Sequence, residues 1–119
     1  MSMELNSAYW NPWLETMAPE RLAELQLTKF RRALAWAYER SPFYRRMYQA
    51  AGLEPGDVKT WEDLRRVPKL DKTKLKEAQT EGPFPYGGVL CLPLQEVAEF
   101  RQTSGTTGQP VYQADSWAD

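Results

Sequence analysis

TSGTTGQP, at residues 103–110, decides how the last part of this chain folds, because it separates two short stretches that have the pattern of β-strands. Ala98, Phe100 and Gln102 alternate with residues of the opposite face, and this period of two is typical of a half-buried strand. Residues 110–113 (PVYQ) predict a second short strand, which starts directly after the loop because proline cannot donate a ladder hydrogen bond. We therefore expect an antiparallel β-hairpin within residues 96–119, with the octapeptide at its turn.

The octapeptide has the composition of an anion-binding loop. Three hydroxyl side chains and two glycines lie within the five residues 104–108. Glycine permits a positive φ, and consecutive N–H groups that turn inward form a concavity to which hydroxyl groups add further donors. The sequence matches neither the Walker A loop nor the Gly-x-Gly-x-x-Gly spacing of dinucleotide-binding folds. We interpret it as a phosphate-binding loop, and the alternative is a flexible polar hairpin turn.

Composition indicates one small folded domain without a long-range electrostatic field. The chain has 119 residues, of which 42% are hydrophobic, and its net charge is -1. We therefore predict neither a nucleic-acid nor a membrane partner. Residues 20–50 carry seven basic and three acidic side chains. We interpret them as solvated helix faces, and the alternative is a basic nucleic-acid surface.

Cys91 is the only cysteine, and histidine is absent. An internal disulfide, a Cys/His zinc site and a Cys-His or Ser-His catalytic pair are therefore excluded, and we predict no metal site. Cys91 lies in the apolar run VLCL at residues 89–92, so we expect a buried, unreactive thiol. The beginning of the chain lacks a signal-peptide pattern and the apolar runs are too short to span a bilayer, which predicts a soluble cytoplasmic protein.

We predict a single partial domain with four parts in chain order. They are an aromatic arm (residues 1–18), a helical region (19–80), a Gly/Pro-rich loop (81–95) and the hairpin with the octapeptide (96–119). The arm contains Trp10 and Trp13 and is expected to pack as an irregular segment. Asp115 or Ser116 is expected to cap a further helix.

The helical region is predicted to hold four helices. The first covers residues 19–40, with Pro19 in its first turn and apolar residues three and four apart. The second starts at Pro42 with Ser41 as N-cap and stops at Gly52. The third starts at Thr60 and ends before Pro68, and the fourth covers residues 72–79 with Asp71 as its cap. Three aromatic residues are expected in the core: Phe30, Trp36 and Trp61.

TSGTTGQP resembles the Ser/Thr-Ser-Gly-Thr-Thr-Gly-x-Pro phosphate loop of adenylate-forming enzymes, the superfamily of acyl-CoA synthetases and luciferases. Flanking segments resemble the phenylacetate-CoA ligase family within it. These segments are Ser41-Pro42-Phe43-Tyr44, Asp63-Leu64, Pro68-Lys69-Leu70, Asp71-Lys72, Pro85-Tyr86-Gly87 and Arg101. The resemblance covers nearly the whole chain from about Leu22 and is strongest at the loop.

The resemblance implies a two-step reaction with ATP (and Mg) and CoA. ATP and an aryl carboxylic acid give an acyl-adenylate and pyrophosphate, and the CoA thiol then displaces AMP to form the thioester. In this family the loop holds the β and γ phosphates of ATP. By this resemblance Thr103 and Ser104 are hydroxyl donors, Gly105 and Gly108 are backbone hinges, and Thr106 and Thr107 are the central phosphate contacts. Many members have Lys in place of Gln109.

Members of this family are several times longer than 119 residues, and their adenine, ribose, magnesium and acyl contacts lie after the loop. The resemblance therefore implies an α+β fold in which helices are followed by the hairpin, as an incomplete N-terminal piece of the large domain. We expect no catalytic residue in this chain, weak ATP binding and no turnover by the chain alone. Lysines near the fourth helix are interpreted as a solvated face, with a CoA-phosphate site as the alternative: Lys69, Lys72, Lys74 and Lys76.

A different class of function remains open. The chain could be an interaction module that forms a homo-oligomer or pairs with a complementing chain through the exposed edges of the hairpin.

Overall fold

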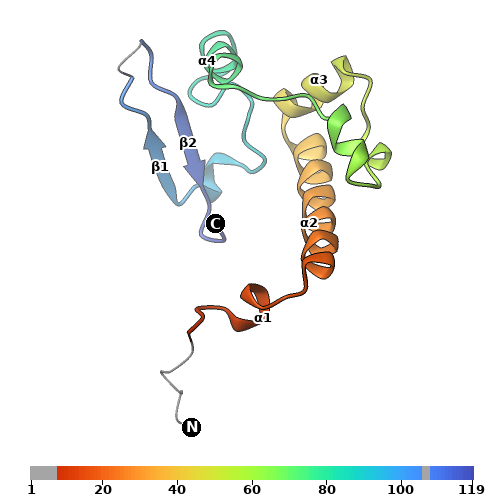
Figure 1. Ribbon diagram of the computed structural model, residues 1–119. Coiled ribbons are helices and arrows are strands. Elements are labelled where there is room, and N and C mark those ends of the chain that lie inside the picture. Colours follow the sequence, from red (N-terminus) through yellow and green to blue (C-terminus); the bar gives the residue numbers. More distant parts are fainter. Residues whose placement is uncertain (1–7, 106–107) are drawn as a thin grey trace.

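The computed structural model describes residues 8–105 and 108–119. These residues form four α-helices, three short 3-10 turns and a two-stranded antiparallel sheet. The helices are α1 (Pro12–Glu15), α2 (Pro19–Arg40), α3 (Pro42–Ala50) and α4 (Lys72–Glu81), and the strands are β1 (Glu99–Gln102) and β2 (Tyr112–Asp115). The 3-10 turns are Pro55–Asp57, Glu62–Arg66 and Leu94–Glu96. Figure 1 shows α2 and α3 on one side of the molecule, and α4 and the hairpin on the other. The predicted α+β order of helices followed by a hairpin is confirmed.

The break between α2 and α3 follows the signals in the sequence. Ser41 is fully buried, and its Oγ accepts the N–H of Tyr44 at 3.2 Å, as an N-cap does. The same hydroxyl donates to the carbonyl oxygen of Gly88 at 3.1 Å, and the N–H of Phe43 donates to that oxygen at 3.1 Å. Ser41 therefore ends one helix, starts the next and holds the Gly/Pro-rich loop against both.

A small core lies where α2 meets α3 and the Pro55–Asp57 turn. Its buried hydrophobic members are Leu34, Tyr48, Leu53 and Val58. The prediction that Phe30, Trp36 and Trp61 are core residues is wrong, since they are 38%, 47% and 47% exposed. The reason is that α2 is covered along one stripe only, so Trp36 stays half exposed, with the Arg40 guanidinium 3.9 Å from its ring centre.

The third predicted helix is a 3-10 turn at Glu62–Arg66 instead. Thr60 and Asp63 do form the reciprocal bonds expected of a capped turn: Asp63 Oδ2 accepts from the Thr60 N–H at 2.8 Å, and the Asp63 N–H donates to Thr60 Oγ1 at 3.4 Å. Pro68 follows closely and leaves no room for a further helical turn. The fourth helix runs two residues beyond its predicted end and stops at Gly82.

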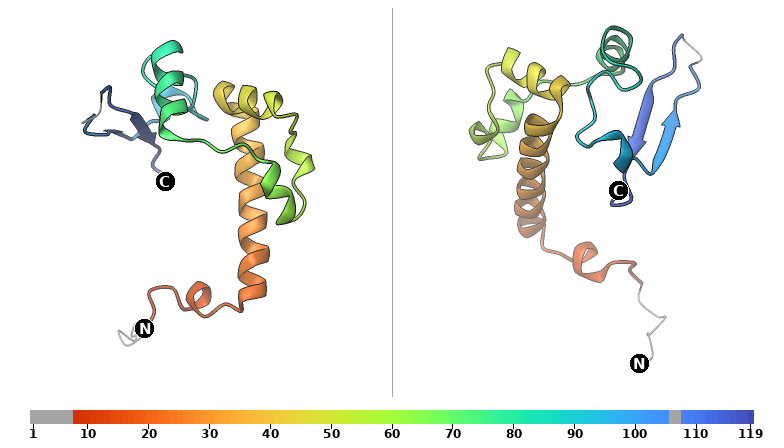
Figure 2. Two further views of the ribbon diagram at one scale, coloured as in Figure 1. Left: turned by 45° about the horizontal axis from the view of Figure 1, so that its top comes forward. Right: turned by 180° about the vertical axis from the view of Figure 1, so that it is seen from behind.

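The aromatic arm does not pack as expected. It contains the single-turn helix α1, whose N-cap is Asn11, and Trp10 and Trp13 are 99% and 64% exposed. Figure 2 shows α1 apart from the other helices and from the hairpin in both views. The two tryptophan rings of the arm therefore remain largely in contact with solvent instead of packing on the chain.

The hairpin pairs Glu99 with Asp115 and Gln102 with Tyr112. Strand β2 begins at Tyr112 and not at Pro110, because the Val111 N–H donates to the Thr103 side chain in place of the ladder. The predicted strand is present as β1, but all four of its residues are exposed, so the prediction that this strand is half buried is wrong. No helix begins at residue 115 or 116: the Asp119 carboxylate accepts the Ser116 N–H at 2.7 Å and closes a turn instead. None of the helices described here is both long and apolar enough to cross a bilayer.

Candidate functional site

The loop between β1 and β2 contains the six residues predicted to bind phosphate. The structure places Thr103, Ser104, Gly105 and Gly108 at the turn of the hairpin, whereas Thr106 and Thr107 lie outside the described residues. Gly105 has φ 66° and Gly108 has φ 129°, both in the region that side chains disfavour. A methyl group on Gly105 would lie 2.7 Å from the Gly108 carbonyl oxygen. The backbone path of this loop therefore requires glycine at residue 105.

Thr103 closes the base of the loop. Its N–H donates to the Val111 carbonyl oxygen at 3.0 Å, and its Oγ1 accepts the Val111 N–H at 2.9 Å. The hydroxyl proton of Thr103 is not used by this bond, so the same side chain can still donate to a ligand. At the tip, the Gly108 N–H donates to the Gly105 carbonyl oxygen at 3.0 Å. The loop is thus a turn held at both ends by hydrogen bonds.

Helix α4 is attached to the outer edge of β2 through Gln79. The Gln79 Nε2 donates to the Tyr112 carbonyl oxygen at 2.9 Å, and its Oε1 accepts the Tyr112 N–H at 2.9 Å. In an antiparallel pair, every second residue turns its backbone groups away from its partner strand, and Gln79 takes the place of a further strand at Tyr112. The sequence contained no signal for this contact, because the two residues are 33 positions apart.

Lys76, one turn before Gln79, lies beside the loop. A methyl group on Gly108 would come within 4.0 Å of the Lys76 Nζ. The sequence was interpreted as placing this lysine on a solvated helix face together with Lys69, Lys72 and Lys74. The structure instead brings its ammonium group next to the candidate phosphate loop.

Arg101, which also matches the family pattern, is directed to acidic groups of the hairpin. Its Nη2 lies 2.5 Å from Asp115 Oδ2, and its Nε donates to Glu99 Oε1 at 2.9 Å. Asp115 lies opposite Glu99 in the register, so the three side chains form one cluster across β1 and β2. The charge of Arg101 is therefore balanced within the hairpin.

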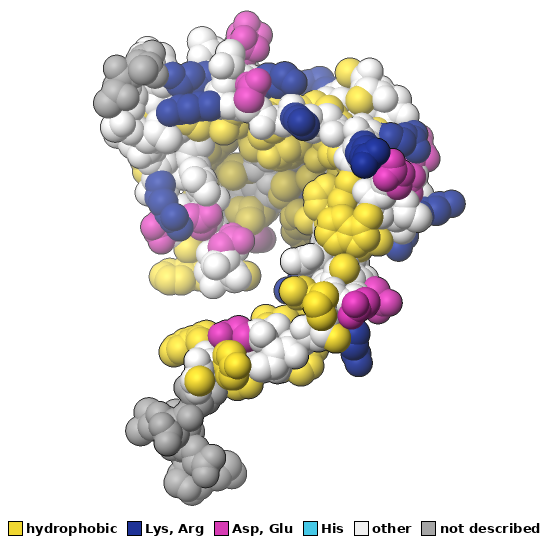
Figure 3. Space-filling view, in the orientation of Figure 1, with side chains coloured by type: hydrophobic (Ala, Val, Ile, Leu, Met, Phe, Trp, Pro, Cys, Tyr) yellow, Lys and Arg dark blue, Asp and Glu magenta, His cyan; other side chains and the backbone are white. Residues whose placement is uncertain are grey.

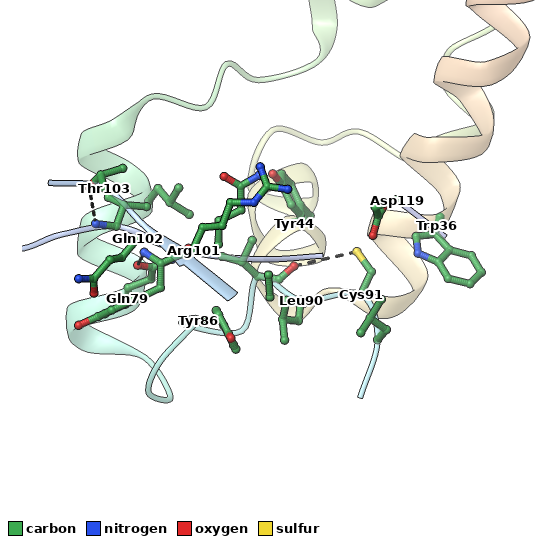
Figure 4. A pocket seen from close by; sticks show the side chains of 17 residues that line it. Trp36, Tyr44, Gln79, Tyr86, Leu90, Cys91, Arg101, Gln102, Thr103 and Asp119 are labelled. Carbon is green, nitrogen blue, oxygen red and sulfur yellow. Dashed lines mark hydrogen bonds between the residues drawn. The ribbon is translucent and has the colours of Figure 1, made fainter. Parts of the chain in front are cut away.

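A cavity of 710 Å³ lies between the hairpin, α4 and the segment at residues 86–92. Figure 4 shows Gln79, Tyr86, Cys91 and Thr103 at its wall, together with Trp36 and Tyr44 from the other side of the molecule. Figure 3 shows hydrophobic side chains gathered in the hollow between the hairpin and α2. Such a volume is in the range of small-molecule sites, and the loop lies at its margin.

The thiol in this cavity is a weak acid. Burial raises the pKa of Cys91, and the nearby charge of Arg40 offsets part of that increase. Burial also raises the pKa of Tyr44, with a smaller contribution from Cys91. Cys91 is partly buried rather than fully buried, so the predicted burial is correct only in part.

The described residues do not form a metal site. Residues 8–105 and 108–119 bring no three Asp, Glu, Cys or His side chains together in a way that could hold a metal ion. Magnesium prefers several oxygen ligands, commonly carboxylates and phosphates. The described carboxylates do not supply such a set.

Comparisons with known proteins show similarity over most of the chain. No family model matches it. It is 41% identical over 101 residues to a phenylacetate-coenzyme A ligase of Thermus thermophilus, covering 85% of this chain and 21% of the relative. It is 32% identical over 112 residues to the enzyme of that name in Escherichia coli, covering 89% of this chain and 24% of the relative.

Solved structures agree with the sequence relatives. The fold matches 2-hydroxyisobutyryl-CoA ligase in complex with 2-HIB-AMP and CoA with a TM-score of 0.88 at 37% identity, over 96% of this chain and 24% of that chain. It matches the same ligase in the postadenylation state in complex with 2-HIB-AMP, with a TM-score of 0.87 at 35% identity. This match covers 96% of this chain and 23% of that chain. The chain thus spans about a quarter of the length of these proteins. In sequence and in fold, the chain corresponds to about a quarter of a phenylacetate-CoA ligase-like protein of the adenylate-forming kind.

Proposed function

We propose that this chain supplies the ATP phosphate loop of an AMP-forming CoA ligase that acts on an aryl carboxylic acid. The observation that carries the proposal is the hairpin turn at residues 103–108, where Gly105 and Gly108 take positive φ values between two hydrogen-bonded strands. Support comes from the match to a ligase structure that contains an acyl-adenylate, 2-HIB-AMP, and CoA.

In the proposed reaction, a carboxylate oxygen of the substrate attacks the α-phosphorus of ATP, and pyrophosphate leaves. The sulfur of CoA then attacks the acyl carbon, and AMP leaves as the thioester forms. The loop binds the β and γ phosphates, and its contribution is to position and stabilise the charge that develops on the departing pyrophosphate. Thr103 and Ser104 donate their hydroxyl protons, and Thr106 and Thr107, which lie outside the described residues, provide the central contacts.

The chain by itself is proposed to be inactive. It contributes the loop and no residue that bonds to the reacting carboxylate or thiol. A few hydrogen bonds must compensate for the loss of freedom of a bound triphosphate, so ATP affinity is expected to be weak. ATP-pyrophosphate exchange by the purified chain with aryl acids is therefore expected to be absent, and clear exchange would contradict this part of the proposal.

A chimaera tests the function of the segment directly. The corresponding 101 residues of the Thermus thermophilus relative are replaced by those of this chain, and phenylacetate-dependent ATP-pyrophosphate exchange is measured. Exchange is expected to persist in the chimaera and to be lost in its Gly105→Val variant, because a side chain at residue 105 would collide with the Gly108 carbonyl oxygen. A folded chimaera without exchange would overturn the proposal, and circular dichroism and thermal unfolding establish whether it is folded.

A second candidate function is favoured by the open shape of the chain. Its radius of gyration is 18.0 Å, whereas a compact chain of this length has one of about 13.5 Å. Phe84 and Trp117 are 80% and 93% exposed, and among the described residues no strand pairs with the outer edge of β1. These features support association with a second copy or with a complementing chain through the hairpin.

Light scattering coupled to size exclusion tests this second function. Phe100 is 52% exposed on β1, so Phe100→Lys is expected to shift a self-associated chain to the monomer. A wild-type chain that stays monomeric at high concentration would contradict self-association.

The net charge of -1 supports the absence of nucleic-acid and membrane partners, and a cytoplasmic location remains a prediction.

A further inference from the structure

The ammonium group of Lys76 lies close enough to the 103–108 loop to contact a ligand bound there. Gly108 has no side chain, and the Lys76 Nζ lies 4.0 Å from the position that its Cβ would occupy. We propose that Lys76 is a cationic contact for the polyphosphate group bound by this loop. The proposal rests on the phosphate binding proposed above and adds a residue from a different element.

The backbone of Lys76 is positioned by the contacts of α4 with the rest of the chain. Asp71 caps the start of α4 by accepting the Lys74 N–H at 2.8 Å. Gln79 joins the same helix to Tyr112, four residues after Gly108, with two hydrogen bonds. Lys76 and Gln79 are three residues apart and therefore lie on one face of α4. Figure 1 and Figure 2 both show α4 beside the strand β2. The helix thus holds Lys76 at the loop while Gln79 holds the helix at the strand.

The charge of Lys76 is available for an anion. In the part of the chain that the structure describes, Lys76 forms no ion pair, whereas Arg101 is paired with Asp115 and Glu99. The loop residue Gln109 is neutral, so among residues 103–110 there is no cationic side chain. Positive charge at the loop therefore has to come from another element, and α4 provides it.

The ligand class follows from this chemistry. A Lys ammonium group is a compact charge with three donors and binds phosphate as a point charge. The Thr103 and Ser104 hydroxyls add neutral donors, whereas the Gly108 N–H already donates to the Gly105 carbonyl oxygen. The site thus combines neutral donors with one cation, which suits the terminal phosphates of a nucleoside triphosphate or of an inorganic polyphosphate.

The test uses the whole 119-residue chain and inorganic tripolyphosphate as the probe. Binding is followed by the backbone amide NMR signals of Gly105 and Gly108 during titration. Lys76→Gln is compared with Lys74→Gln, which removes the same charge from the same helix. Lys74 is a matched control because it lines a groove with Phe43 and Met47, on the side toward α3. Lys76→Arg is included because it keeps the charge.

The wild-type chain is expected to show saturable shifts at both glycines. Lys76→Gln is expected to weaken binding by about threefold to tenfold, the range of a single charge contact near a surface, with Lys74→Gln close to wild type and Lys76→Arg in between. If Lys76→Gln and Lys74→Gln weaken binding equally, the contact is overturned while phosphate binding by the loop stands. If the wild-type glycines do not respond to tripolyphosphate, phosphate binding by this chain is overturned, and the role of Lys76 with it.

Discussion

Gln79 and Tyr112 form a two-point contact in which a side-chain amide replaces a β-strand. Both hydrogen bonds, Nε2 to the Tyr112 carbonyl oxygen and the Tyr112 N–H to Oε1, measure 2.9 Å. The contact covers part of a strand edge that would otherwise present unpaired backbone groups. It also connects the helical part of the chain to the hairpin that carries the candidate site.

Gln79→Ala is expected to destabilise the docking of α4 on the hairpin. The substitution leaves two partly buried backbone groups of Tyr112 without partners, at a cost of about 1–3 kcal/mol. Hydrogen exchange of the Tyr112 amide should accelerate. Gln49→Ala serves as a control, since the exposed Gln49 side chain donates only a long bond of 3.3 Å to the Tyr38 hydroxyl. Equal exchange at Tyr112 in both variants would contradict the role given to Gln79.

Gly105→Ala is expected to lower stability and to disturb the loop. Residue 105 has φ 66°, and an added methyl group would lie 2.7 Å from the Gly108 carbonyl oxygen and 3.2 Å from the Pro110 nitrogen. A cost of about 1–3 kcal/mol is expected from chemical denaturation. Gly56→Ala is the matched control, because nothing lies within 4 Å of that position and its φ is not positive. It should be neutral or stabilising by about 0.4–1 kcal/mol.

Thr103→Val tests the closure of the loop base. Valine has nearly the shape of threonine but cannot accept the Val111 N–H, which Thr103 Oγ1 now accepts at 2.9 Å. A loss of about 1 kcal/mol in unfolding free energy is expected, with faster exchange of the Val111 amide. Thr103→Ser keeps the hydroxyl and should retain most of the protection. Unchanged exchange in the valine variant would show that another group satisfies this N–H.

Asp63 predicts a dependence of stability on pH. Backbone N–H groups of Lys59 and Thr60, followed by the Thr60 hydroxyl, hold the pKa of Asp63 below its ordinary value of 3.8. A carboxylate with a depressed folded-state pKa adds stability above its unfolded pKa, and this stability is lost as the pH falls through the folded pKa. Denaturation midpoints of the wild type should therefore decline below about pH 4 more steeply than those of Asp63→Asn. Parallel curves would argue against the contribution.

Cys91 is expected to react slowly with thiol reagents. Burial raises its pKa, and the thiolate is the reactive form, so alkylation by iodoacetamide near pH 8 should be slower than for a small free thiol such as glutathione. Arg40 lowers the pKa in part, and Arg40→Gln should slow the reaction further. Mass spectrometry of the alkylated chain gives the rates. A rate equal to that of glutathione would contradict the shielding of Cys91.

Local signals in the sequence determined most of the helix boundaries. Pro19 and Ser41 delimit α2, Asp71 caps α4, and Thr60 bonds to Asp63 as predicted. Each signal acts between residues at most four positions apart, so it does not depend on the rest of the fold. The octapeptide is also a local signal, because its glycines and Pro110 specify a turn between two strands whatever surrounds it. The roles of its individual hydroxyls in phosphate binding remain predictions.

Only the tertiary structure decided which surfaces are covered and which residues meet at the loop. Trp36 and Phe100 have the character of core residues, yet they are exposed, because burial depends on a neighbouring element that the local pattern does not reveal. The bonds from Ser41 to Gly88 and from Gln79 to Tyr112 join residues 47 and 33 positions apart. The sequence also does not distinguish Lys76 from the neighbouring lysines. Its place beside Gly108 follows from the docking of α4 on β2, which results from packing between distant segments.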